Sequence, residues 1–312
     1  MILTASEKTF EIITSLQKCR RTMESAYELN PLGMDKIPEL LDVLKSLLPD
    51  SVVAYNWLLT LSRWTSTDKE MKLIILCPNG DCEDGSMVGL VENLAVPDRI
   101  FGTLYCQRQN IELMKEALLK TSLIEWSKLK HFSAVLSRFV PSMAEVYTAK
   151  GLTLKAVPCD LAIMQPEKAM NISIPSLLPN VRVRRLDESF LDVVCDNWPH
   201  YDFQYRPVVL KMLQLNHSVG VFVKTANDEE QLASMVLQGE YGGLGLLQTL
   251  TEHQRKGFAE IATASLTKTL GMEGIMPHGY ILSENKIGKQ LFEKIGFEVI
   301  GSVAKLVVVQ RV

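Results

Sequence analysis

The chain has 312 residues, of which 47% are hydrophobic, so it is long enough for two domains of ordinary size and a substantial core. Its formal net charge is −3 and its lysines and arginines form no long run, which excludes the basic surface expected of a nucleic-acid-binding protein. No segment has the uninterrupted apolar length of a membrane span, so we expect no membrane partner.

The N-terminal segment carries Glu7, Lys8 and Glu11 where a secretion signal needs an apolar stretch. We therefore expect an intracellular protein, either cytoplasmic or mitochondrial. The six cysteines suggest no disulfide framework and are expected to be reduced. Cys77 and Cys82 flank an Asn-Gly turn, but no second Cys or His pair follows at zinc spacing, so we expect no metal site.

The first half of the chain is predicted to mix helices and strands. A helical stretch is expected over 6–29, and a second helix with one apolar stripe is expected between Asp35 and Pro49. Further helical patterns begin near Ile111 and end at Gly151. A polar turn region is expected at 79–86. The apolar runs predicted as strands are 52–61, 71–76, 100–106 and 152–164.

A proline-containing segment separates the two halves. Pro166, Pro175 and Pro179 interrupt any helix or central strand, which predicts a linker at 166–180 between domains at 1–165 and 181–312. Both halves follow the order helix, strands, helix, strand, helix, strand, although no sequence repeat is visible. The elements expected in the second half are strands at 181–185, 219–224, 232–238 and 244–250 and helices near 189–198 and 207–215.

The arginines of the segment 182–185 alternate with valine at first. This pattern predicts the solvent-facing side of an edge strand rather than a nucleic-acid site.

A short glycine-bearing loop follows the strand at 244–250. Its residues are Gln254, Arg255, Lys256, Gly257, Phe258 and Ala259. A helical pattern comes next, so the loop lies at a helix N-terminus, where unpaired N–H groups and the helix dipole favour a phosphate. Small side chains at Gly257 and Ala259 let a ligand approach the backbone closely. The loop therefore predicts a pyrophosphate-binding site.

The residues after this loop support a more specific interpretation of it. The helix ends near Gly271, 278–282 is expected to be a strand, and Asn285 precedes a second helix closed by Gly296 and Phe297. This combination resembles the acyl-CoA-binding half of the GNAT acyltransferase superfamily. The resemblance implies that the N–H groups of 255–259 bind the pyrophosphate of coenzyme A.

The same resemblance implies contacts along the rest of the coenzyme. Thr249 and Leu250 would pair with the pantetheine arm, and Asn285 would contact it from across the site. One residue departs from the pattern, because Phe292 stands where many relatives carry a tyrosine that protonates the departing thiolate.

A second likeness covers more of the chain. The segments 123–126, 194–198 and 248–254 resemble glycine N-acyltransferases, which join a degenerate GNAT-like N-terminal half to an active C-terminal half. We therefore expect an α/β (α+β) fold of two GNAT-like domains in tandem, each a mixed, mostly antiparallel sheet flanked by helices. The first half lacks a Gln-x-x-Gly-x-Ala loop, so it is expected to bind no coenzyme.

Acyl transfer to an amine needs a base and a route for the thiolate to leave. Glu240 is the first candidate for the base, with a plain hairpin carboxylate as the alternative. His253 is the second candidate, with loop surface as the alternative, and Tyr241 is a candidate acid or an exposed turn residue. His200, Tyr201 and Asp202 are expected near the acceptor pocket, while Trp198 is expected in the core.

Together these features predict an acyl-CoA-dependent N-acyltransferase. It would transfer an acetyl or longer acyl group to the amine of a small molecule, including an amino acid such as glycine, by direct attack on the thioester. The alternative is a non-catalytic acyl-CoA-binding or interaction protein that kept the coenzyme loop. The oligomeric state is left open.

Overall fold

The computed structural model describes residues 27–311 except 96, 199–202 and 226. The helix expected over 6–29 therefore lies mostly outside the described residues, and Leu29 already begins a strand. No helix within the described ranges is long and apolar enough to cross a membrane.

The described residues form one twelve-stranded sheet. Its order is β1-β2-β3-β4-β5-β12-β6-β11-β10-β9-β8-β7. The strands are β1 (Leu29–Pro31), β2 (Lys72–Pro78), β3 (Met87–Glu92), β4 (Ile100–Tyr105), β5 (Leu129–Leu136), β6 (Leu152–Ile163), β7 (Val181–Arg184), β8 (Ser218–Lys224), β9 (Glu230–Gln238), β10 (Leu244–Thr249), β11 (His278–Leu282) and β12 (Glu298–Arg311).

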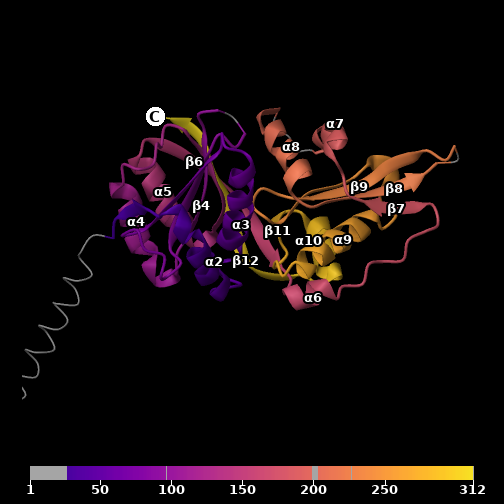
Figure 1. Ribbon diagram of the computed structural model, residues 1–312, viewed down its shortest axis with the longest axis horizontal. Coiled ribbons are helices and arrows are strands. Elements are labelled where there is room, and N and C mark those ends of the chain that lie inside the picture. Colours follow the sequence, from indigo (N-terminus) through magenta and orange to yellow (C-terminus); the bar gives the residue numbers. More distant parts are fainter. Residues whose placement is uncertain (1–26, 96, 199–202, 226, 312) are drawn as a thin grey trace, which may run out of the picture.

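The two halves of the chain exchange their last strands. Strand β12, from the end of the chain, pairs with β5 of the first half, and β6 of the first half pairs with β11 of the second. In the middle, β6 and β12 pair antiparallel from Glu298↔Ile163 to Arg311↔Leu152. Figure 1 shows yellow β12 running among the indigo and magenta elements of the first half. The two sides of the sheet thus repeat one arrangement, which confirms the tandem fold predicted from the sequence.

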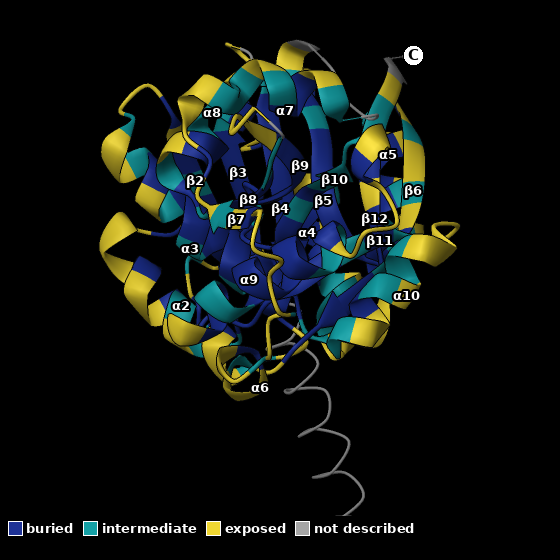
Figure 2. Cartoon of the chain, turned by 90° about the vertical axis from the view of Figure 1, so that its right-hand side faces the viewer, coloured by how far each residue is buried: buried dark blue, intermediate teal, exposed yellow. Residues whose placement is uncertain are grey.

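Helices cover the sheet. Their bounds are α2 (Ile37–Ser46), α3 (Val52–Thr67), α4 (Ile111–Lys120), α5 (Val140–Ala149), α6 (Pro166–Met170), α7 (Leu191–Asn197), α8 (Arg206–Leu215), α9 (Phe258–Met272) and α10 (Lys286–Ile295). Figure 2 shows the dark blue buried strands inside a layer of partly exposed helices. Most of the helices expected from apolar spacing are confirmed.

The strand expected at 52–61 is wrong, because this segment is the first part of helix α3. The run is rich in β-branched and aromatic residues, which favour strands. However, Val53, Trp57, Leu61 and Trp64 are buried at intervals of three or four residues, which is the period of a helix. For this segment, the length of the apolar run indicated the structure better than its residue composition did.

The sequence prediction lacks the edge strand β1 and the central strand β12. It also lacks two further strands, β3 and β5, and it continued helices through the region of β5. All but one residue of each strand is buried, so neither shows the alternation of polar and apolar residues that identifies a half-buried strand. The segment predicted as a linker also contains helix α6, since Pro166 occupies the first helical turn, where proline is tolerated. The domain bounds 1–165, 166–180 and 181–312 stay a prediction.

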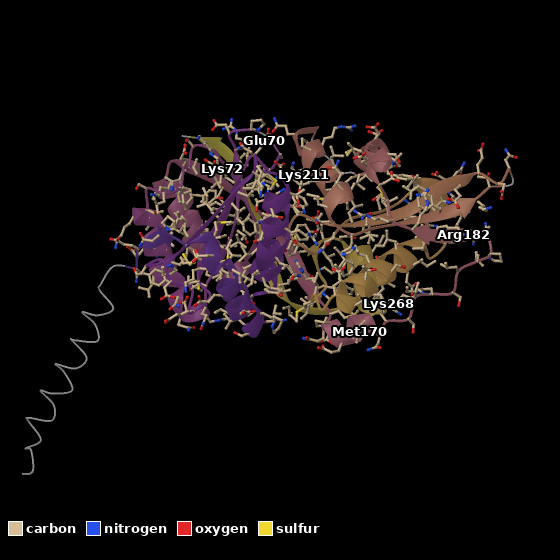
Figure 3. All side chains as sticks on the ribbon, viewed as in Figure 1. Glu70, Lys72, Met170, Arg182, Lys211 and Lys268 are labelled. Atoms are coloured by element: carbon tan, nitrogen blue, oxygen red, sulfur yellow. The ribbon has the colours of Figure 1, made fainter. Side chains whose placement is uncertain are left out.

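The edge position of the arginine-rich segment is confirmed, because β7 is the last strand of the sheet. Figure 3 shows Arg182 on this outer strand, far from the boundary between the halves. Arg185 donates hydrogen bonds to three carbonyl groups at the end of α8, those of Leu213, Gln214 and Asn216. These contacts give the cluster a structural explanation.

Helix α3 joins the two halves beyond the exchanged strands. The Nη2 atom of Arg63 and the indole nitrogen of Trp64 both donate hydrogen bonds to the Asn216 side chain, at 2.7 and 2.8 Å. Near the end of the helix, Asp68 pairs with Lys211, which Figure 3 places at the boundary between the halves. The first half thus forms a fixed support for the second.

Candidate active site

Strands β10 and β11 separate soon after they meet. They are parallel and pair at Leu244↔Gly279. The pairing of β10 with β9 shifts between Gly245 and Gln248, and Leu246 there has a φ of +50°. A bulge of this kind bends a strand, so β10 turns away from β11. Backbone groups of β10 that do not bond β9 then face a gap between the two strands.

The equivalent strands of the first half stay together. Strands β4 and β5 are also parallel, but they pair at Ile100↔Leu129, Phe101↔His131 and Gly102↔Phe132. The Phe132 ring covers Gly102, because a Cβ on that glycine would lie 2.6 Å from the ring. Strands β4 and β5 therefore leave no gap like the one between β10 and β11. That the first half binds no coenzyme stays a prediction.

A cavity of ≈ 560 Å³ occupies the open gap and extends toward the first half. Its apolar lining includes Phe101, Leu246, Ile281, Phe292, Val303 and Val307. Its polar lining includes Tyr205, Glu240, Gln248, Tyr280, Asn285 and Lys305. The two halves thus contribute to one cavity. No group of three or more His, Cys, Asp or Glu side chains in the described part of the chain could hold a metal ion.

The predicted phosphate loop follows β10 after a short 3-10 turn at Thr251–His253. Arg255 and Gly257 have φ values of +61° and +83°, and Gly257 is the N-cap of the fifteen-residue helix α9. No side chain caps this helix, so the N–H groups of its first turn, including those of Phe258 and Ala259, lack the partners that capping supplies. A Cβ on Gly257 would meet no atom within 4 Å. The loop therefore presents backbone donors to open space, as an anion site requires.

The other predicted coenzyme residues lie around this loop and the gap. Both backbone groups of Leu250 are already bonded, its N–H to Ala233 and its carbonyl oxygen to the N–H of His253. The Thr249 hydroxyl is 2.9 Å from that of Ser234, and the side chains of Gln254 and Lys256 donate to backbone oxygens nearby. Gln248 and Leu247 line the cavity in their place. The coenzyme roles of Thr249, Leu250, Gln254 and Lys256 stay predictions.

Asn285 and Phe292 line the cavity from the opposite side of the gap. The Asn285 side chain caps α10 by accepting a hydrogen bond from the N–H of Gly288 at 2.9 Å. The Phe292 ring is buried against that of Phe297, with ring centroids 4.8 Å apart, and covers Gly279 of β11. Phe292 therefore forms an apolar wall at the point where β10 and β11 separate.

Glu240 lies in the tight turn between β9 and β10, in the cavity wall. Only 6% of the residue is exposed, and its Oε2 atom has no hydrogen-bond partner among the described residues. Burial raises the pKa of Glu240, while a hydrogen bond from the Tyr205 hydroxyl and the charge of Lys305 act in the opposite direction. A buried carboxylate with an unbonded oxygen can accept a proton, and the role of Glu240 as the base stays a prediction.

Glycines allow the Glu240 turn to pack against both halves. Gly242 has a φ of +77°, and a Cβ on it would lie 2.5 Å from the backbone oxygen of Asn56 in α3. A Cβ on Gly243 would lie 2.7 Å from the Nε2 atom of His278 in β11. Larger residues at either position would push the turn outward. The position of Glu240 thus depends on contacts with the first half.

The other two catalytic candidates lie in different environments. The Tyr241 hydroxyl donates to the backbone oxygen of Leu244 at 2.8 Å, and its ring packs on Tyr280 with centroids 4.5 Å apart. Tyr241 is therefore not an exposed turn residue, and its proton already has an acceptor. His253 is buried rather than on the loop surface, and it is not part of the cavity lining. Glu240 and Tyr241 are brought together, while His253 is apart.

Some predicted acceptor residues cannot be placed. His200, Tyr201 and Asp202 lie outside the described residues. Trp198 was expected in the core, but it is half-buried and lines the cavity. Its ring packs beside that of Tyr205, with centroids 5.8 Å apart. This places an aromatic wall next to the carboxylate of Glu240.

Comparisons with known proteins agree with this architecture. The model of the FR47-like protein family matches residues 218–306, from β8 into β12. No curated protein sequence matches the chain significantly. The crystal structure of a Drosophila protein solved by a structural genomics consortium is similar over 91% of this chain and 99% of its own, with a TM-score of 0.77 and 21% identity. A tandem GNAT protein from the clavulanic acid biosynthesis pathway has a TM-score of 0.52 and 11% identity, covering 89% of this chain and 97% of its own.

The chain has the fold of the GNAT superfamily. A GNAT-type glucosamine N-acetyltransferase region of a fungal multi-domain β-N-acetylglucosaminidase is also similar, with a TM-score of 0.51 and 11% identity, covering 90% of this chain and 38% of that one. These similarities extend over both halves of the chain. They confirm the GNAT fold expected from the loop at 254–259.

Sequence reasoning missed three residues in or beside the cavity wall: Tyr205, His278 and Tyr280. A signal existed for two of them, because His278 and Tyr280 are two positions apart in a short apolar strand and so share one face. A polar pair on one face of a buried strand needs partners. Tyr205 gave no such signal, since its link to Glu240 depends on the packing of α8 beside the turn.

Proposed function

We propose that the protein is an acyl-CoA-dependent N-acyltransferase that transfers an acyl group to the amine of a small molecule, including an amino acid. One observation carries this proposal: a buried carboxylate with an unbonded oxygen faces the same cavity as the open gap between β10 and β11. The loop at 254–259 follows β10 after one short turn, and its backbone N–H groups would supply donors for a pyrophosphate. Acetyl-CoA or another acyl-CoA would lie with its phosphates at this loop and its thioester in the gap.

The reaction requires few steps. The nitrogen of the acceptor amine attacks the thioester carbonyl carbon, and Glu240 accepts a proton from that nitrogen. The carbon–sulfur bond then breaks, and its electron pair leaves with the sulfur of coenzyme A. A raised pKa makes Glu240 a stronger base than an exposed glutamate, although it must still be ionised to act. Backbone N–H groups of β10 in the gap would stabilise the oxyanion.

Thiol release from a panel of acyl-CoAs tests the function directly. The panel should include acetyl, medium-chain and aromatic acyl groups, each assayed with amino acids and with simple amines as acceptors. We expect thiol release that depends on the amine, together with formation of the amide. Binding of acyl-CoA without turnover on any amine would instead support the alternative of a non-catalytic acyl-CoA-binding protein.

Replacing Tyr205 with phenylalanine should shift the pH dependence of the reaction. The hydrogen bond from the Tyr205 hydroxyl lowers the pKa of Glu240, so its removal raises that pKa further. The acid limb of kcat/KM should therefore move to higher pH in Tyr205→Phe. The measurement needs a weakly basic amine, whose own protonation does not mask this limb. A limb that stays in place would separate Glu240 from the proton transfer.

Phe292→Tyr tests whether the missing tyrosine matters. The thiol of coenzyme A resembles that of cysteine, whose pKa is about 8.5, so its thiolate is a tolerable leaving group without a dedicated acid. We expect turnover within about three-fold of the wild type, measured at several pH values with one fixed amine. A silent wild type beside an active Phe292→Tyr would favour the non-catalytic protein that lost its acid.

A further inference from the structure

Among the described residues, three tyrosines line the cavity, and the hydroxyl groups of two of them already donate hydrogen bonds to protein acceptors. The Tyr205 hydroxyl donates to Glu240, and the Tyr241 hydroxyl donates to the backbone oxygen of Leu244. The third, Tyr280, lies on β11 beside the point where β10 and β11 separate. Its oxygen is 3.1 Å from the Nε2 atom of His278. The direction of this hydrogen bond decides what Tyr280 can do.

Asn56 determines that direction. Its side-chain nitrogen is 2.9 Å from the backbone oxygen of Met276 and 2.9 Å from the Nδ1 atom of His278. The carbonyl oxygen of Met276 accepts only, so the NH₂ group of the amide, and not its oxygen, must occupy this position. The same NH₂ group faces Nδ1, which must therefore be the bare, accepting nitrogen of the ring.

His278 then has its proton on the other nitrogen. The residue is fully buried, and burial lowers its pKa to about 3 although the nearby backbone carbonyl of Met276 acts in the opposite direction. The ring is therefore neutral and carries one N–H group, and the Met276 oxygen already accepts a hydrogen bond from Asn56. With Nδ1 accepting from Asn56, this N–H is at Nε2 and donates to the Tyr280 oxygen. The hydroxyl proton of Tyr280 is consequently free to point into the cavity.

We propose that Tyr280 is a catalytic residue whose hydroxyl donates a hydrogen bond to the oxyanion formed on the thioester carbonyl, and that Asn56 and His278 are positioning residues that direct its proton. This inference rests on the proposed acyl-transfer function. No proton is transferred, since the hydroxyl keeps its hydrogen while the negative charge on the carbonyl oxygen forms and collapses. Burial raises the pKa of Tyr280 well above its ordinary value, so the donor stays protonated during the reaction.

The arrangement gives the first half of the chain a part in catalysis. Asn56 belongs to α3, whereas His278 and Tyr280 belong to β11, which lies beside α3 in Figure 1. The same helix also contacts the Glu240 turn through Gly242. A half without a coenzyme loop would thus orient both the base and the oxyanion donor of the other half.

The kinetics of Tyr280→Phe test whether the Tyr280 hydroxyl donates a hydrogen bond to the oxyanion. Loss of one oxyanion donor typically lowers kcat by about a hundred-fold or more. We expect a fall of that size, with the KM for acyl-CoA and the coenzyme-induced thermal shift nearly unchanged. Turnover equal to that of the wild type would overturn this inference while leaving the acyl-transfer function intact. A wild type that releases no thiol with any amine would overturn the proposed function, and this catalytic role with it.

Two variants of His278 test whether its ring positions the Tyr280 hydroxyl. Glutamine can place an amide N–H near the position of Nε2, whereas leucine cannot donate. His278→Leu should lose turnover to the same degree as Tyr280→Phe, and His278→Gln should recover a measurable part of it. Equal losses in both variants, with equal melting temperatures, would indicate that the imidazole only fills space.

Nitrogen-15 NMR of the wild-type imidazole tests the tautomer directly and does not depend on activity. We expect chemical shifts of the Nε2–H tautomer for His278, assigned by the disappearance of its signals in His278→Gln. Signals of the Nδ1–H tautomer would mean that Tyr280 donates to the ring instead of to the cavity, and would overturn the inference whatever the kinetics show.

Discussion

Glu240→Gln is expected to lower acyl-transfer turnover by about ten-fold or more, which is the low end of general-base effects. Glutamine has nearly the same shape, and it can still accept the hydrogen bond from Tyr205, but it cannot take a proton from the amine. The measurement is kcat with a saturating acyl-CoA and amine, together with the thermal shift produced by coenzyme A. The shift should be unchanged, because the phosphate loop at 254–259 is not altered.

The stability of Glu240→Gln provides an internal check. An acid whose pKa is raised in the folded state stabilises the fold below its unfolded pKa, and this contribution is lost as the pH rises through the folded pKa. At neutral pH the wild type therefore bears the cost of a buried carboxylate, which glutamine removes. We expect a melting temperature equal to or above that of the wild type. Glu229 is exposed, so Glu229→Gln is a matched control that should alter neither the turnover nor the melting temperature. Full turnover in Glu240→Gln would contradict its role as the base.

Gly257→Glu is expected to abolish the binding of coenzyme A. The substitution places a negative side chain at the N-terminus of α9, where the proposed pyrophosphate would approach the backbone donors. Because a Cβ at this position meets no atom within 4 Å, the apo protein should remain folded. The thermal shift with coenzyme A, and its titration by calorimetry, are the measurements.

Gly257→Ala is the matched control. Both variants carry a Cβ at a φ of +83°, which costs about 1–2 kcal/mol in a left-handed conformation, so both should lose a similar amount of stability. Only the glutamate adds bulk and charge in the space outside the loop. Gly257→Ala should therefore retain most of the ligand-induced shift. If Gly257→Glu keeps an undiminished shift, the phosphates bind elsewhere.

Local patterns were sufficient to predict the structure around the loop at 254–259. Gly257, the helical spacing after it and the cap at Asn285 are each determined by neighbouring residues, and the strand at 278–282 agrees with the structure to the residue. The burial of Glu240 was harder to predict, because a hairpin carboxylate looks the same in sequence whether or not another element covers it.

Local sequence patterns did not reveal the long-range contacts. The hydrogen bond between Asn56 and His278 joins residues 222 positions apart, and Asn56 lies in a segment whose composition favoured a strand. The exchange of β6 and β12 has no local signal either, because each strand has the same apolar pattern whichever neighbour it pairs with. Partner choice in a sheet is determined by the whole fold, which explains why the site residues contributed by the first half were missed.

The exchange of β6 and β12 also governs how the protein could be divided. A cut in the segment between α6 and β7 would leave each piece holding the strand that completes the sheet of the other, so the two pieces would remain associated. A fragment beginning at 181 would lack β6, and both β11 and β12 would then expose unpaired backbone edges prone to aggregation. Although the chain contains two copies of one architecture, the smallest part expected to fold by itself consists of both halves together.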